Sequence, residues 1–125
     1  MILGIGLDLV ELPRFTAVLE RHGARFEDRV FTPGERRVGG GEGARTLSLA
    51  ARFAAKEACM KALGTGWGQG VGFTQIEVLR GSNGEPTLRL HGAAEQAARR
   101  LGVKRTLVSL SHQPGVAGAM VVLEG

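Results

Sequence analysis

The segment that most constrains the fold is an alanine-rich stretch at residues 49–63, which has the length and apolar periodicity of one long helix. At 3.6 residues per turn, Glu57 falls beside the apolar face, on a row with two alanines and Lys61. Such small neighbours leave space around the carboxylate, in which a metal ion or a phosphate would fit. The alternative is a Glu57–Lys61 pair on a solvated helix face, which stabilises a helix by only about 0.2–0.5 kcal/mol.

A second carboxylate, Asp8, lies within the apolar run that opens the chain. This run has the length of one β-strand, about residues 2–9, and its alternation places Asp8 on the same face as Gly4 and Gly6. We expect that face to be open, because glycines let a ligand or another backbone come close. A carboxylate in a buried strand is unfavourable unless it is paired, hydrogen-bonded or bound to a metal. The alternative is an Asp at a strand end that caps the next helix, since Pro13 suits a first helical turn.

Two short motifs, in this order, resemble those of a known family. They are Gly4-Ile5-Gly6-Leu7-Asp8, followed six residues on by Arg14, and Phe53-Ala54-Ala55-Lys56-Glu57-Ala58 with Lys61-Ala62. Further matches are Gly64-Thr65-Gly66, Asn83-Gly84-Glu85-Pro86 and Ser109-Leu110-Ser111-His112. The chain therefore resembles holo-acyl-carrier-protein synthase, the small bacterial type of 4′-phosphopantetheinyl transferase, over essentially all 125 residues.

The resemblance implies an enzyme that moves the phosphopantetheine arm of coenzyme A onto a serine of apo acyl carrier protein and releases adenosine 3′,5′-bisphosphate. This reaction supports fatty acid biosynthesis. The serine hydroxyl would attack a pyrophosphate whose charged oxygens repel a nucleophile, and Mg²⁺ held by one or two carboxylates and the substrate phosphates reduces that repulsion. The resemblance assigns Asp8 and Glu57 to the metal, Lys61 to the phosphates, and all three to catalysis.

The group that removes the serine proton stays open between Glu57, acting directly or through a metal-bound water, and His112. By resemblance we assign His112 to coenzyme A binding. The complete set expected to bind coenzyme A is Arg52, Lys61, Gly64, Thr65, Gly66, Pro86 and His112. Lys56 faces away from the Glu57 row, and either contacts another phosphate or stays solvated. His22 and His91 show no partner pattern, and we interpret them as surface residues.

The net charge of +4 and the isoelectric point of about 10.2 favour an acidic partner. Arg14, Arg21 and Arg25 share one helical face if the helix expected at residues 12–21 persists past Gly23. The resemblance assigns them to docking of acyl carrier protein; the alternative is a solvated basic face. A nucleic-acid-binding module is a competing interpretation, but the chain has few aromatic residues for base stacking and no recognisable nucleic-acid motif. A different Mg²⁺-dependent phosphotransferase would need a Gly-Lys-Ser/Thr loop, which is missing.

Length and composition favour a single compact domain over residues 1–125, with 43% hydrophobic and 22% charged residues. The fold class implied by the resemblance is α+β, a mainly antiparallel sheet wrapped around one long helix. No signal peptide or membrane-length segment is evident, so we expect a cytoplasmic protein that does not bind membranes. The resemblance also implies a homotrimer with sites at subunit interfaces. Consistently, a final strand at about residues 116–123 is apolar on both faces and should be covered on both.

Local signals predict the remaining elements. Strands are expected at about residues 73–80, 87–91 and 105–112, and helices at 93–101 and after the capping box that begins at Thr32. We expect Ser48 to cap the long helix, Gly64 to end it, and the single Cys59 to be buried.

Two glycine-rich stretches are expected to be irregular. Residues 39–43 replace a longer polar connection expected of the family, which leaves Arg45 as the nearest substitute for its basic contacts. Residues 64–70 follow a helix and precede a strand, the reverse of the order in a phosphate-binding loop. We interpret them as a close-approach turn that lines the ligand cleft, with a plain linker as the alternative.

Overall fold

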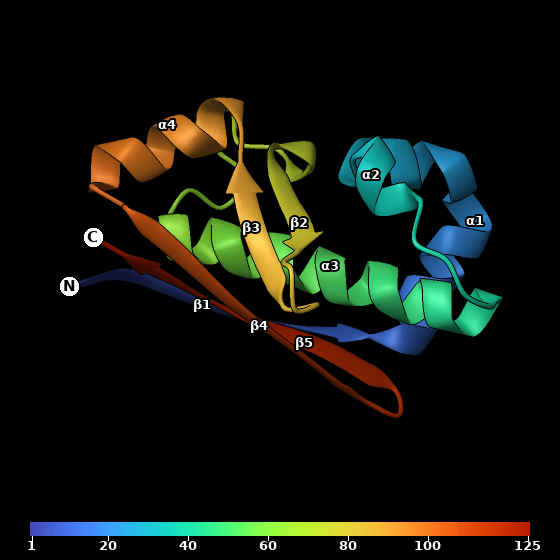
Figure 1. The fold of residues 1–125 in the computed structure, drawn as a ribbon. Coiled ribbons are helices and arrows are strands. Elements are labelled where there is room, and N and C mark those ends of the chain that lie inside the picture. Colours follow the sequence, from blue (N-terminus) through green and yellow to red (C-terminus); the bar gives the residue numbers. More distant parts are fainter.

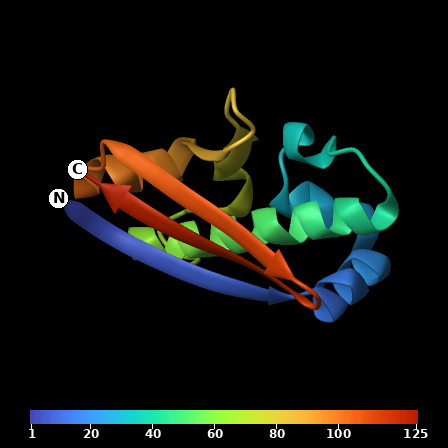
Figure 2. The same ribbon diagram turned by 60° about the horizontal axis from the view of Figure 1, so that its bottom comes forward.

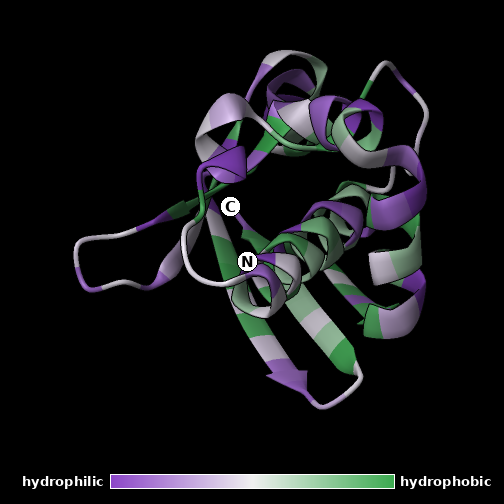
Figure 3. Ribbon diagram, turned by 90° about the vertical axis from the view of Figure 1, so that its right-hand side faces the viewer, coloured by the Kyte–Doolittle hydropathy of each residue, from purple (hydrophilic) through white to green (hydrophobic).

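Helix α3 (Glu42–Leu63) runs through the middle of the molecule, between a three-stranded sheet on one side and a two-stranded hairpin on the other (Figure 1). The computed structural model describes Met1–Gly125. The fully buried residues of α3 are mostly small, and include Ala50, Ala54, Ala55 and Ala58. Small side chains on several sides of a helix allow it to be packed from several sides, which explains the central place of α3. Figure 3 shows hydrophobic residues along this helix and along the strands that lie against it.

The three-stranded sheet is antiparallel, in the order β1-β5-β4, and α3 packs across one of its faces (Figure 2). Its strands are β1 (Ile2–Glu11), β4 (Arg105–Gln113) and β5 (Val116–Glu124). Asp8 pairs with Ala119 and Leu7 with Met120, so β5 fixes the position of the first motif. The chain ends meet at one edge, where the amino group of Met1 donates a hydrogen bond of 2.9 Å to the carbonyl oxygen of Gly125.

The other side of α3 carries the remaining elements. They are α1 (Leu12–Val30), α2 (Pro33–Arg36), η1 (Phe73–Gln75), the antiparallel pair β2 (Ile76–Arg80) and β3 (Pro86–Leu90), and α4 (Gly92–Leu101). The α+β fold with an antiparallel sheet around one long helix is thus confirmed. None of the helices combines the length and the apolar character that crossing a membrane requires.

The glycine face of β1 is covered, although we expected it to be open. A Cβ atom at Gly4 or Gly6 would overlap a backbone carbonyl oxygen of α3. The close approach that the glycines allow is therefore that of another backbone. As a result the alternate residues of β1, Ile5, Leu7 and Leu9, point away from α3 and are exposed in the single chain.

Several boundaries differ from the sequence-based prediction. Helix α1 extends to Val30 but is two helical segments joined at Gly23, whose φ of 49° and ψ of −125° are not helical. Helix α3 begins at Glu42 after an N-cap at Gly41, so Ser48 lies inside the helix and caps nothing. The predicted strand at residues 73–80 opens with the 3₁₀ turn η1. The capping box at Thr32 and the left-handed C-cap at Gly64 are confirmed.

Candidate active site

Asp8 and Glu57 line one cavity of about 330 Å³, together with Arg14 and the ring of Phe53. Asp8 comes from β1 and Glu57 from the face of α3 that packs against this strand. Lys61, one turn after Glu57, donates hydrogen bonds to Asp8 Oδ1 at 3.0 Å and to the Leu7 carbonyl oxygen at 2.9 Å. The two carboxylates and the lysine that the motifs single out therefore gather at one place.

The environment of Glu57 disfavours its negative charge. Burial raises the pKa of Glu57, and the nearby charge of Asp8 raises it further. Lys61 and the indole of Trp67 act in the opposite direction and only partly offset this rise. A second cation near both carboxylates would relieve their repulsion.

The donor set fits a hard divalent cation that takes its other ligands from substrate and water. No group of three or more His, Cys, Asp or Glu side chains is arranged to hold a metal. Two carboxylates in one cavity would instead suit a Mg²⁺ ion that takes its other ligands from phosphates and water. Asp8 and Glu57 are the residues that would hold it.

A second cavity, of about 480 Å³, brings together Arg52, Pro86 and His112. These residues come from α3, the start of β3 and the end of β4. They are three of the seven residues expected to bind coenzyme A, and nothing in their sequence spacing indicates that they meet. Lys61 and Gly64–Gly66 lie elsewhere, because the twelve residues from Arg52 to Gly64 span about 18 Å of helix.

The glycine-rich loop at residues 64–70 lies beyond the C-terminal end of α3 and lines neither of these two cavities. Its Trp67 is exposed and packs edge-on against Phe73, with 5.3 Å between the ring centroids. Phe73 in turn stacks on Phe53, which lines the cavity of Asp8 and Glu57. The loop is thus connected to the carboxylate cavity through aromatic rings, and the turn interpretation stays a prediction.

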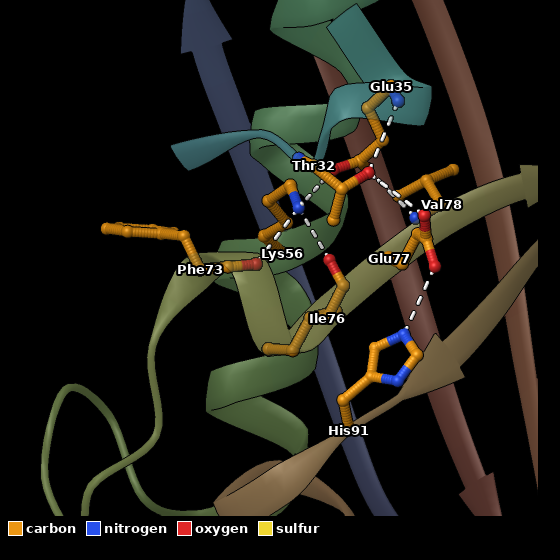
Figure 4. Close-up of polar contacts among 8 residues, drawn as sticks. All are labelled: Thr32, Glu35, Lys56, Phe73, Ile76, Glu77, Val78 and His91. Carbon is orange, nitrogen blue, oxygen red and sulfur yellow. Dashed lines mark hydrogen bonds and ion pairs between the residues drawn. The ribbon is translucent and has the colours of Figure 1, made fainter. Parts of the chain in front are cut away.

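Lys56 is fully buried, so both interpretations made from the sequence, a phosphate contact and a solvated side chain, are wrong. Its ammonium group donates to Glu35 Oε1 at 2.7 Å and to the carbonyl oxygens of Phe73 at 2.9 Å and Ile76 at 2.5 Å (Figure 4). Burial lowers the pKa of Lys56, and the adjacent Glu35 carboxylate acts against this change. Lys56 therefore ties α2, η1 and β2 to the helix that carries Glu57.

His91 has a partner that its sequence neighbours did not indicate. Its Nε2 lies 3.1 Å from Glu77 Oε1, and the other oxygen of Glu77 accepts a hydrogen bond of 2.9 Å from the Thr32 hydroxyl (Figure 4). These contacts lower the pKa of Glu77 against the effect of its burial. The interpretation of His91 as a surface residue without a partner is wrong, whereas His22 is exposed as expected.

Arg45, in the first turn of α3, does not have the role expected from the sequence. Arg45 is paired with Glu27 at 2.5 Å and 3.2 Å and also donates to the carbonyl oxygen of Arg36, so it does not replace the family's basic contacts to a ligand. The carboxylate of Glu27 gains its lowered pKa chiefly from this hydrogen bond with Arg45. Only residues 39–41 of the glycine-rich stretch lie outside a helix.

Arg14, Arg21 and Arg25 do not form one continuous helical face. Arg14 lines the carboxylate cavity, and all three side chains are exposed. The non-helical Gly23 separates Arg25 from the other two. A shared face required the helix to continue unbroken past Gly23, and it does not, although all three arginines belong to α1.

Cys59 is fully buried, as predicted, and burial raises the pKa of its thiol to about 12. Because the thiolate is the reactive form of cysteine, Cys59 is a packing residue of α3 and has no part in the candidate site.

Comparison with known proteins identifies the class of protein that this fold and site define. The sequence model of the 4′-phosphopantetheinyl transferase superfamily matches residues 4–117. The matched region contains Asp8, Glu57, Lys61 and His112.

More specific matches come from single proteins. The chain is 50% identical to the holo-[acyl-carrier-protein] synthase of Desulfovibrio desulfuricans, with 99% of this chain and 98% of the relative covered. Among solved structures, it is similar to the holo-[acyl-carrier-protein] synthase of Neisseria meningitidis, with a TM-score of 0.89, 34% identity and full coverage of both chains. It is also similar to the Bacillus anthracis synthase in complex with CoA (3′,5′-ADP), with a TM-score of 0.82, 39% identity, and 99% and 97% of the two chains covered. The chain therefore belongs to the holo-acyl-carrier-protein synthase family.

Proposed function

We propose that this chain transfers the 4′-phosphopantetheine arm of coenzyme A to a serine of apo acyl carrier protein, giving holo acyl carrier protein and adenosine 3′,5′-bisphosphate. The observation that carries the proposal is that Asp8 and Glu57 line one cavity and that Lys61 donates a hydrogen bond to Asp8, in a chain of this family. The product supports fatty acid biosynthesis, and a cytoplasmic location would give the enzyme both substrates.

Asp8 and Glu57 hold Mg²⁺ in this proposal. The ion supplies charge neutralisation and orientation for the pyrophosphate when it is bound. Lys61 leaves Asp8 and donates to a phosphate oxygen, since its side chain is half exposed and reaches only one carboxylate. Glu57 accepts the serine proton, directly or through a water, because its carboxylate faces the cavity and can accept a hydrogen bond from either group.

Arg52, Pro86 and His112 bind coenzyme A at the second cavity. His112 orients the ligand, and a role as the base is the alternative. The cavity of Asp8 and Glu57 shares no lining residue with this second cavity. A complete site would therefore form when the second cavity of one subunit meets the carboxylate cavity of its neighbour.

A homotrimer is the assembly that we propose for this pairing. The face of the three-stranded sheet turned away from α3 carries the exposed side chains of Ile5, Leu7, Leu9, Leu107 and Met120. A contiguous apolar surface of this kind favours burial against another subunit. It also supports the expectation that the final strand is covered on both faces.

The acidic acyl carrier protein docks through Arg14, Arg21 and Arg25, of which Arg14 lies nearest the carboxylates. Exposed positive side chains steer a negatively charged partner toward the surface and set its orientation. The basic chain needs no nucleic-acid or membrane partner to explain its charge.

One assay tests the activity. The protein is incubated with coenzyme A, Mg²⁺ and apo acyl carrier protein, and the carrier protein is weighed by mass spectrometry. The proposal requires a mass increase of one phosphopantetheine arm, which must depend on Mg²⁺. Light scattering of the same sample measures the assembly, and a monomer that retains activity would contradict the trimer.

A further inference from the structure

A groove beside α4 is separate from both cavities of the candidate site. It has a volume of about 320 Å³ and is bounded by β3, α4 and the start of β4, and we call it the α4 groove. Its floor is apolar and includes Leu88, Leu90 and Val103, whereas its rim is basic and includes Arg89, Lys104 and Arg105. It shares no lining residue with the carboxylate cavity or with the cavity proposed for coenzyme A.

Residues 88–106, which form this groove, carry a positive charge as large as that of the whole chain. They contain five basic residues and one acidic residue, a net charge of +4, which equals the formal net charge of all 125 residues. Helix α1, which carries the arginines proposed to dock acyl carrier protein, has four arginines and three acidic residues. The α4 groove is therefore a more basic surface than α1.

Most of this charge is available to a partner. Arg89, Arg100 and Lys104 are exposed and take part in no ion pair of the chain. Arg99 and Arg105 each pair with one carboxylate, but both pairs lie in solvent, where an ion pair contributes little and is readily exchanged. An acidic partner thus meets little competition from carboxylates of the chain itself.

The floor of the groove favours a protein as the partner. Leu88, Leu90 and Val103 are only partly buried and pack on the core below, so an apolar side chain can contact them from outside. No aromatic side chain lines the groove, which removes the stacking that single-stranded nucleic acids use. A flat membrane surface would reach the rim but leave the concave floor uncovered. An acidic protein segment with an apolar side chain among its carboxylates fits both parts.

We propose that the α4 groove is a second docking site for acyl carrier protein, separate from the arginines of α1. The inference rests on the proposed function, which supplies the acidic partner. Helices α1 and α4 lie at opposite ends of the molecule (Figure 1), so a carrier protein in the groove leaves the carboxylate cavity accessible to another one. Such a site holds carrier protein close to the enzyme and raises the rate of encounter.

Isothermal titration calorimetry with apo acyl carrier protein at low ionic strength tests the second site, since the Debye length is about 30 Å at 0.01 M salt. The unmodified protein should bind two carrier proteins per chain. Lys104→Glu and Arg89→Glu should each weaken one of the two sites by about tenfold, because a reversed charge removes an attraction and adds a repulsion. Arg29→Glu reverses an equal charge at an exposed position outside the groove, and as the matched control it should leave that site unchanged.

Transfer kinetics separate the groove from the catalytic site. Both groove variants should keep the kcat of the unmodified protein, because Asp8 and Glu57 line another cavity, and should lower kcat/KM for carrier protein several-fold. A large loss of kcat would make the groove part of the catalytic site and overturn the separate assignment.

The stoichiometry distinguishes the remaining outcomes. One carrier protein per chain, with transfer intact, would overturn the second site and leave the proposed function standing. The same holds if the groove variants lose binding to single-stranded RNA or to anionic phosphatidylglycerol vesicles but not to carrier protein. Absence of both carrier-protein binding and transfer would refute the proposed function, and this inference with it.

Discussion

Replacing Lys56 by Met tests whether this lysine is structural, as its burial indicates. The ammonium group is the only bridge between the Glu35 carboxylate and the carbonyl oxygens of Phe73 and Ile76. In the variant, Glu35 keeps two backbone donors, the amides of Thr32 at 3.0 Å and Val78 at 2.9 Å, but loses its counter-charge. Removing one partner of a buried ion pair lowers the free energy of unfolding by about 3–5 kcal/mol.

Thermal and urea unfolding measure this loss. For a chain of this length the melting temperature should fall by about 12–20 °C, at roughly 4 °C per kcal/mol. The double variant Lys56→Met/Glu35→Gln should be more stable than Lys56→Met, because it leaves no lone buried charge, and the coupling between the two sites should be about 1–3 kcal/mol. All samples need the same subunit concentration, since assembly shifts the apparent stability.

Binding of coenzyme A to the folded variant is the measurement that could contradict a structural role for Lys56. At a temperature well below its midpoint, Lys56→Met should bind coenzyme A nearly as tightly as the unmodified protein. The structural argument would be wrong if the variant had the same urea midpoint as the unmodified protein but bound coenzyme A much more weakly. That result would show that Lys56 contacts a phosphate.

Four further expectations concern the site and its supports. Asp8→Asn should nearly abolish transfer while changing the free energy of unfolding by less than about 1 kcal/mol, because the Asp8–Lys61 pair is partly exposed; full turnover would exclude Asp8 from catalysis. Glu57→Gln should be at least as stable as the unmodified protein at pH 7, and should lose this advantage below about pH 4.5. The reason is that a carboxyl group whose pKa is raised on folding stabilises the folded state at low pH, and this contribution disappears as the pH rises through the folded pKa. Gly6→Ala should destabilise the chain by more than about 1 kcal/mol in urea unfolding, since the added Cβ overlaps a carbonyl oxygen of α3, whereas Gly43→Ala, with open space around it, should not. Added salt should raise the KM for acyl carrier protein more than that for coenzyme A, and Arg14→Glu should flatten this dependence; loss of coenzyme A affinity instead would move Arg14 to the nucleotide site.

Local signals predicted most of the fold. The alanine-rich periodicity indicated the long helix, the capping box and the glycine C-cap marked two helix ends, and the two motifs named Asp8, Glu57 and Lys61. The N-terminal end of α3 was misplaced, because the glycines at 41 and 43 suggested irregular structure and Ser48 suggested a cap. Serine is a better N-cap residue than glycine, so local preference favoured Ser48 over Gly41 as the start of the helix.

Contacts between distant residues could not be predicted. Lys56 meets partners at Glu35 and Phe73, and His91 meets Glu77, in pairs that helix or strand periodicity does not connect. The exposure of Ile5 and its neighbours was equally hidden, because alternation separates the two faces of β1 but does not say which of them α3 covers. Close backbone approach at Gly4 and Gly6 decided that question in favour of the glycine face.

The central helix explains how neighbouring residues come to have opposite roles. Lys56 and Glu57 are adjacent, so they point about 100° apart around α3. Arg52 and Lys56 stand four residues apart on the row that faces α2 and β2, and Glu57 and Lys61 stand four apart on the row that faces β1. The first row combines a buried structural ion pair with Arg52 of the cavity proposed for coenzyme A, and the second carries the carboxylate and the lysine proposed for catalysis. Because one rigid helix carries both rows, Lys56 fixes the rotation of α3, and with it the direction in which Glu57 points toward Asp8.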